Sequence, residues 1–81
     1  MMSKAETVKI ITDAVREVTG IEIKSPDTNL LGRDVGIIPA DFLYIFDIVE
    51  KRTGRDMCGV IADAHYTIMT PNNLAEAIAG E

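Results

Sequence analysis

The chain has 81 residues, of which 47% are hydrophobic, and its formal net charge at pH 7 is -5. This length predicts one domain over residues 1–81 with a single small core. The negative charge argues against general affinity for nucleic acid or anionic membranes, because both depend on a basic surface.

The first predicted element is a helix over residues 4–19. The stretch Ser3-Lys4-Ala5-Glu6 fits a capping box, in which the outer two side chains each bind an amide at the helix start. Apolar residues then recur at helical spacing, and Gly20 supplies the left-handed residue that commonly ends a helix. The residues expected on the buried side are Val8, Ile11, Val15 and Val18.

A long loop is predicted from Gly20 to Ile38, since proline, glycine, asparagine and serine recur in it. Loops of this length are uncommon in compact domains unless they serve a function. Its apolar residues are expected to hold the loop against the helices. These residues are Ile21, Ile23, Leu30 and Leu31.

The second predicted helix begins at Pro39, whose fixed φ and missing amide suit the first helical position. It runs to Thr53, with Gly54 as its stop. The face expected to point into the core carries Phe42, Ile45, Phe46 and Val49, with Thr53 below them. The remaining surface carries Ala40, Asp41, Tyr44, Asp47, Ile48 and Lys51.

The last predicted helix starts at Pro71, after Thr70 as its cap. It is expected to direct Leu74, Ala77 and Ile78 inward. Residues 55–69 are expected to hold a third, short helix. Because no segment alternates in the manner of a strand over enough residues, the sequence predicts an all-α fold.

Residues able to perform chemistry are few. Cys58 has no second cysteine for an internal disulfide, and we expect it to be a small buried side chain. His65 has no evident nucleophile or orienting partner, so we expect it to be structural or exposed. One cysteine and one histidine do not supply the four ligands of a structural zinc site. The sequence therefore predicts no catalytic residue, no metal site and no enzymatic activity.

Several segments are similar, in kind and order, to parts of acyl carrier proteins. Thr28-Asn29-Leu30-Leu31 resembles the segment before that family's active loop, and Asp34-Val35-Gly36 resembles the residues that lead into it. Residues 45–54 resemble the second helix with its closing glycine, and residues 69–78 resemble the last helix. The resemblance implies an acyl-carrier-like four-helix bundle, with three long helices, one short helix and a long loop between helices 1 and 2.

One departure from that family concerns its chemistry. In acyl carrier proteins an Asp-Ser-Leu triplet opens the second helix, and the serine hydroxyl carries the phosphopantetheine arm. The equivalent triplet here is Ile38-Pro39-Ala40, so Pro39 stands at the attachment position and offers no hydroxyl. The resemblance thus implies a degenerate member of the family with no cofactor, and it extends to the acyl carrier-related proteins of bacterial peptide maturation systems.

A degenerate carrier suggests a non-catalytic adaptor that docks onto a biosynthetic or peptide-modifying enzyme through the second helix and the loop before it. We expect it to be cytoplasmic, since Cys58 is a single cysteine and no basic segment followed by an apolar run stands at the N-terminus. We also expect a monomer. Tyr44 and Ile48 lie one turn apart on the side away from the predicted core, where they could contact a partner. The alternative is that Tyr44 packs along the helix and Ile48 borders the third helix. The candidate partner-binding residues are Ala40, Asp41, Tyr44, Asp47, Ile48 and Lys51.

Two other functions stay open at this point. A genuine carrier could use another hydroxyl, with Ser25 or Thr28 in the long loop as candidates. A lipid-binding protein could instead hold a free acyl chain between its helices without a covalent tether. The expected walls of such a site are Phe42, Ile45, Phe46 and Leu74.

Overall fold

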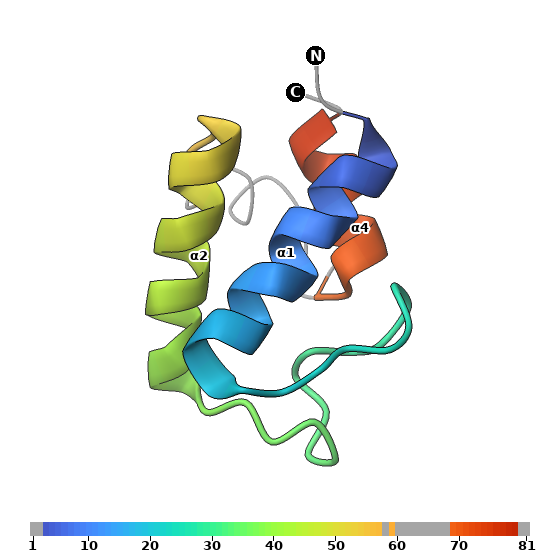
Figure 1. Ribbon diagram of the computed structural model, residues 1–81, viewed down its shortest axis with the longest axis vertical. Coiled ribbons are helices and arrows are strands. Elements are labelled where there is room, and N and C mark those ends of the chain that lie inside the picture. The colour runs from blue at the N-terminus through green and yellow to red at the C-terminus, as the bar shows by residue number, and fades with distance from the viewer. Residues whose placement is uncertain (1–2, 58, 60–68, 80–81) are drawn as a thin grey trace.

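A computed structural model describes residues 3–57, 59 and 69–79, and these residues form helices joined by loops, with no strand (Figure 1). The elements are α1 (Lys4–Thr19), α2 (Pro39–Thr53) and α4 (Pro71–Ala79). Helix α1 packs against both α2 and α4. The predicted all-α class is confirmed for the described residues. The expected short helix in residues 55–69 falls mostly outside them.

The start of α1 is a complete capping box, as predicted. The Glu6 amide donates to Ser3 Oγ at 3.2 Å, and the Ser3 amide donates to Glu6 Oε1 at 3.4 Å. The amide and the hydroxyl of Thr7 both donate to the Ser3 carbonyl at 3.0 Å. At the other end Gly20 adopts φ 76°, and its amide donates to the Arg16 carbonyl at 2.8 Å. Both predicted helix signals are therefore confirmed.

Helix α2 also has the predicted bounds, but it begins differently. Ile38 takes the extended backbone of a cap residue, with φ −84° and ψ 152°, yet its side chain makes no capping hydrogen bond. Pro39 follows at the first helical position. The helix ends at Gly54, whose φ is 75° and whose amide donates to the Glu50 carbonyl at 2.8 Å.

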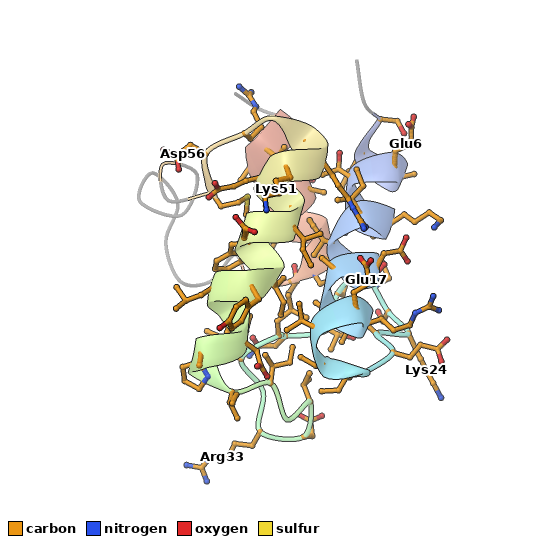
Figure 2. The ribbon with its side chains drawn as sticks, turned by 60° about the vertical axis from the view of Figure 1, so that its left-hand side comes forward. Glu6, Glu17, Lys24, Arg33, Lys51 and Asp56 are labelled. Carbon is orange, nitrogen blue, oxygen red and sulfur yellow. The ribbon has the colours of Figure 1, made fainter. Side chains whose placement is uncertain are left out.

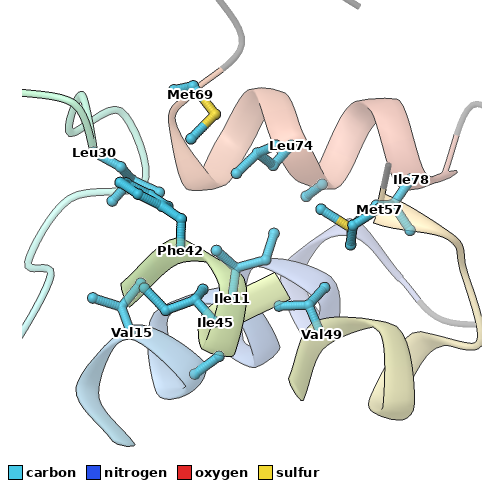
Figure 3. Packing of buried hydrophobic residues seen from close by; sticks show 12 residues of the cluster. Ile11, Val15, Leu30, Phe42, Ile45, Val49, Met57, Met69, Leu74 and Ile78 are labelled. Atoms are coloured by element: carbon cyan, nitrogen blue, oxygen red, sulfur yellow. The ribbon is translucent and has the colours of Figure 1, made fainter. Parts of the chain in front are cut away.

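The core lies where the three helices and the long loop meet, and Figure 3 shows their apolar side chains converging. On α1, Ile11 and Val15 are buried as expected, and Ala14 joins them. Thr7 is buried as well, because its hydroxyl is satisfied by the backbone of the preceding turn. The full cluster is Ile11, Ala14, Val15, Leu30, Phe42, Ile45, Val49, Met57, Met69, Leu74, Ala75 and Ile78.

Three expectations about burial are corrected by the structure. Phe46 is only half-buried, because it lies at the edge of the core rather than in the middle of the inward face. Leu31 is 52% exposed and does not hold the loop, since Leu30 alone of this pair faces the core. Ile48 is half-buried and packs against the core, whereas the sequence placed it on the side away from the core.

The long loop is fixed against the start of α4 by hydrogen bonds. The Leu30 amide donates to the Met69 carbonyl at 2.7 Å, and the Asn72 amide donates to the Pro26 carbonyl at 2.8 Å. Asn72 Nδ2 also donates to Asp27 Oδ1 at 3.1 Å. These bonds place the loop at the end of the molecule where α1 ends and α2 begins (Figure 1). Within the described ranges, no helix combines the length and the apolar character that crossing a membrane requires.

Candidate functional site

The surface of α2 predicted to bind a partner is divided by the structure. Ala40, Tyr44, Asp47 and Lys51 are exposed, and Tyr44 is 65% exposed. Asp47 Oδ2 and Lys51 Nζ lie 2.9 Å apart, so these two charges pair with each other along the helix. A partner protein could contact an exposed ion pair of this kind, but the pair adds little to the stability of the fold.

The remaining two predicted residues are less accessible. Asp41 is half-buried in the first turn of α2, and Ile48 packs against the core. Tyr44 and Ile48 therefore do not form the joint apolar contact that their spacing suggested. Leu43, which the sequence analysis did not single out, is 74% exposed beside Tyr44.

An apolar pocket lies between the loop and the start of α2. Its volume is about 600 Å³. Of the walls expected for a lipid site, Phe42 and Phe46 line this pocket, while Ile45 and Leu74 lie in the core instead. The lining residues are Leu31, Gly32, Arg33, Gly36, Ile37, Ile38, Pro39, Phe42, Phe46 and Met69.

The pocket wall combines buried and accessible apolar groups. The rings of Phe42 and Phe46 have centroids 5.6 Å apart and are tilted by 36°, a mutually favourable arrangement. Leu31 and Ile38 are 52% and 57% exposed, so part of the pocket wall is accessible to solvent. Pro39, at the expected attachment position, is part of the wall. Its ring thus contributes apolar surface to the pocket.

Arg33 is the charged residue among those lining the pocket. Figure 2 shows it extending from the loop at the end of the molecule where α2 begins. Within the part of the chain that the structure describes, Arg33 has no hydrogen-bonding or ion-pairing partner. Several other basic side chains do have partners, since Lys4 pairs with Glu76 at 2.8 Å and Arg52 with Glu17 at 2.8 Å. The pocket therefore has one available positive charge at its wall.

The hydroxyl residues considered as attachment points for a genuine carrier, Ser25 and Thr28, take part in the turn structure of the loop. Ser25 Oγ accepts a hydrogen bond from the Asp27 amide at 3.2 Å, which closes a turn. Thr28 is half-buried, and its amide donates to the Ser25 carbonyl at 3.2 Å. Neither residue opens a helix. Residues 3–57, 59 and 69–79 contain no cluster of acidic, histidine or cysteine side chains able to hold a metal ion. Cys58 and His65 lie outside the described residues.

The sequence analysis predicted Phe42 and Phe46 as walls of an apolar site but missed the part of the pocket formed by the loop and the start of α2, although a local signal for it exists. Serine, threonine, aspartate and asparagine dominate at helix N-caps, because their oxygens bind the first amides. Here the cap position and the residue before it are Ile38 and Ile37. Two exposed or half-buried isoleucines in place of a polar cap indicate a helix start made for apolar contact.

Comparisons with protein-family models, with curated protein sequences and with solved structures give no match to this chain. The fold class therefore rests on the structure itself. The resemblance to acyl carrier proteins stays a prediction from the sequence.

Proposed function

We propose that the protein is a non-catalytic adaptor with an acyl-carrier-like four-helix bundle. It docks onto a biosynthetic or peptide-modifying enzyme through the loop before α2 and the first turns of that helix. The supporting observation is where exposed apolar side chains gather. In the described ranges, every large hydrophobic residue that is strongly exposed falls between residues 31 and 44. These residues are Leu31, Ile38, Leu43 and Tyr44.

This distribution favours a protein contact over chance exposure. Isolated exposed hydrophobic residues are normal on any protein, but a group confined to one end is typical of an interaction site. Binding energy at interfaces also concentrates in a few large side chains, with tyrosine among the most frequent. The ion pair of Asp47 and Lys51 lies next along α2, where it would sit at the rim of such a contact.

The docking proposal is tested by capturing the partner from the native host and titrating variants against it. Leu43→Ala and Tyr44→Ala should each weaken binding by roughly 1–3 kcal/mol while the melting curve stays unchanged. Glu76→Ala, on exposed α4 surface, is the control and should bind like the parent. Parental affinity in both apolar variants would place the interface elsewhere and overturn the proposal.

The absence of a prosthetic group is a separate part of the proposal, supported by Pro39 at the attachment position. Incubation with coenzyme A and a permissive phosphopantetheinyl transferase should leave the intact mass unchanged. Pro39→Ser should be loaded poorly, because Ile38 replaces the aspartate that precedes the serine in working carriers. Efficient loading of that variant would indicate a working carrier surface. A mass increase in the parent itself would contradict the adaptor proposal.

A second candidate function is the non-covalent binding of an acyl chain or lipid. It is favoured by the apolar pocket of about 600 Å³ beside Phe42 and Phe46. Ligand sites in proteins commonly measure roughly 300–1,000 Å³ and are lined mainly by apolar side chains. Solvent extraction of the purified protein, followed by mass spectrometry of the extract, should then recover an acyl compound in stoichiometric amount.

A further inference from the structure

We propose that the pocket at the start of α2 binds a free molecule with one alkyl chain and an anionic head group. The chain lies in the pocket and the head group pairs with Arg33. This inference rests on the second candidate function, and it adds the chemical class of the ligand and the residue that recognises its charge.

The lining of the pocket favours an alkyl chain over a ring system with polar substituents. Its side chains are aliphatic, aromatic or thioether groups, apart from Arg33. A ligand with several hydrogen-bonding groups would bury them here without partners, at a cost of roughly 1–3 kcal/mol for each group. A methylene chain has no such groups, and each buried methylene contributes about 0.8 kcal/mol. The pocket wall therefore selects for plain hydrocarbon.

The opening of the pocket favours a negative head group. Arg33 lines the pocket, and no acidic residue does so among those the structure describes. The neighbouring Asp34 directs its carboxylate toward Gly32. A guanidinium is always charged and can donate two parallel hydrogen bonds to a carboxylate or phosphate.

The start of α2 lies at the same pocket. Pro39 is both the first residue of the helix and part of the wall. No side chain caps this end. The first turn of a helix carries a partial positive charge, which an anion close by would stabilise. Asp41 already places a negative charge in this first turn, so the preference for an anionic head group rests on Arg33.

The test compares three ligands that share a twelve-carbon chain. Dodecanoate, dodecanol and dodecylammonium are titrated below their aggregation limits by calorimetry, at low and at high potassium chloride concentration. We expect dodecanoate to bind about twofold to fivefold more tightly than dodecanol, as for an exposed ion pair, and dodecylammonium to bind most weakly. High salt should weaken dodecanoate alone, because screening acts on the ion pair.

Two matched variants test whether Arg33 is the residue that pairs with the head group. Arg33→Gln should reduce the affinity for dodecanoate to that for dodecanol. Arg16→Gln makes the same charge change at an exposed position on α1, and it should bind all three ligands like the parent. Both variants should keep the parental melting temperature, since neither side chain is buried.

The outcomes separate the inference from the function on which it rests. If none of the three ligands binds, both the pocket function and the head-group inference are overturned. If dodecanol binds as tightly as dodecanoate, or if the two arginine variants behave alike, the role of Arg33 is wrong while chain binding stands.

Discussion

The starts of α1 and α2 share a backbone geometry but differ in chemistry. Ser3 has φ −74° and ψ 161°, and Ile38 has φ −84° and ψ 152°. Ser3 and Glu6 use their side chains to satisfy amides of the first turn. Ile38 instead leaves its side chain 57% exposed at an apolar pocket.

This difference shows that the start of α2 lacks the stabilising side-chain cap that the start of α1 has. A polar cap is worth about 0.5–2 kcal/mol relative to alanine, so its replacement by isoleucine lowers helix stability. Small domains have little stability to spare. Apolar side chains at the start of α2 therefore favour a role in contact, while the capping box at the start of α1 stabilises the helix.

The largest expected effect on stability comes from removing the Phe42 ring, which anchors the first turns of α2 in the core. Phe42 is 9% exposed and belongs both to the core and to the pocket wall. Phe42→Ala should therefore lower the free energy of unfolding by about 3–5 kcal/mol, through lost burial and an unfilled cavity. Urea denaturation measures this change. The half-buried Phe46 is the control, and Phe46→Ala should cost clearly less. The reverse order would contradict the position of the core given by the structure.

An exchange of cap residues tests the comparison directly. Ser3→Ala should destabilise the protein by roughly 0.5–2 kcal/mol, because the Glu6 amide loses its partner. Ile38→Ser should instead stabilise it by about 0.5–1 kcal/mol, since the backbone at this position already suits a cap and Asp41 stands three residues later. The same variant should bind dodecanoate more weakly. Thermal and urea unfolding give the two stabilities.

The outcome of that exchange also bears on the role of Ile38. If Ile38→Ser lowers stability, the apolar contacts of the isoleucine outweigh a missing cap, and the start of α2 serves the fold like that of α1. The difference between the two helix starts would then carry no information on function.

The smallest expected effect lies on the exposed flanks, where the two helices are alike. Lys9 Nζ and Asp13 Oδ2 lie 2.7 Å apart on α1, with the same four-residue spacing as Asp47 and Lys51 on α2. The hydrogen bond from Lys9 is the main cause that lowers the pKa of Asp13 from its ordinary value of 3.8. At pH 7, Asp13→Asn and Asp47→Asn should each cost about 0.2–0.5 kcal/mol.

The pH dependence of the Asp13 contribution follows from that lowered pKa. The ionised carboxylate is favoured in the folded state, so its contribution is present above pH 3.8 and is lost as the pH falls through the lowered folded value. Parent and Asp13→Asn should thus differ slightly at neutral pH and converge in acid, as measured by urea unfolding at each pH. If the two proteins still differ in stability in strong acid, the effect of the asparagine does not come from losing the charge of Asp13.

The sequence by itself determined the helix bounds of α1 and α2. Their start and stop signals are local, since a cap, a proline at the first position and a left-handed glycine each act through the backbone of adjacent residues. Ser3, Gly20, Pro39 and Gly54 therefore predicted both elements correctly. The buried faces of Ile11, Val15, Ile45 and Val49 also followed from helical spacing alone.

Only the tertiary structure decided which residues at the edges of those faces are buried. From helical spacing alone, Phe46 and Ile48 could each lie on the buried face or on the exposed face of α2. Contacts from other elements determine how far each one is buried. Leu30 and Leu31 are equally apolar, yet only Leu30 faces the core, where its amide bonds to the Met69 carbonyl. The pocket arises in the same way. Most of its wall comes from the loop and the first half of α2, which are adjacent in the chain, and the fold adds Met69, from just before α4.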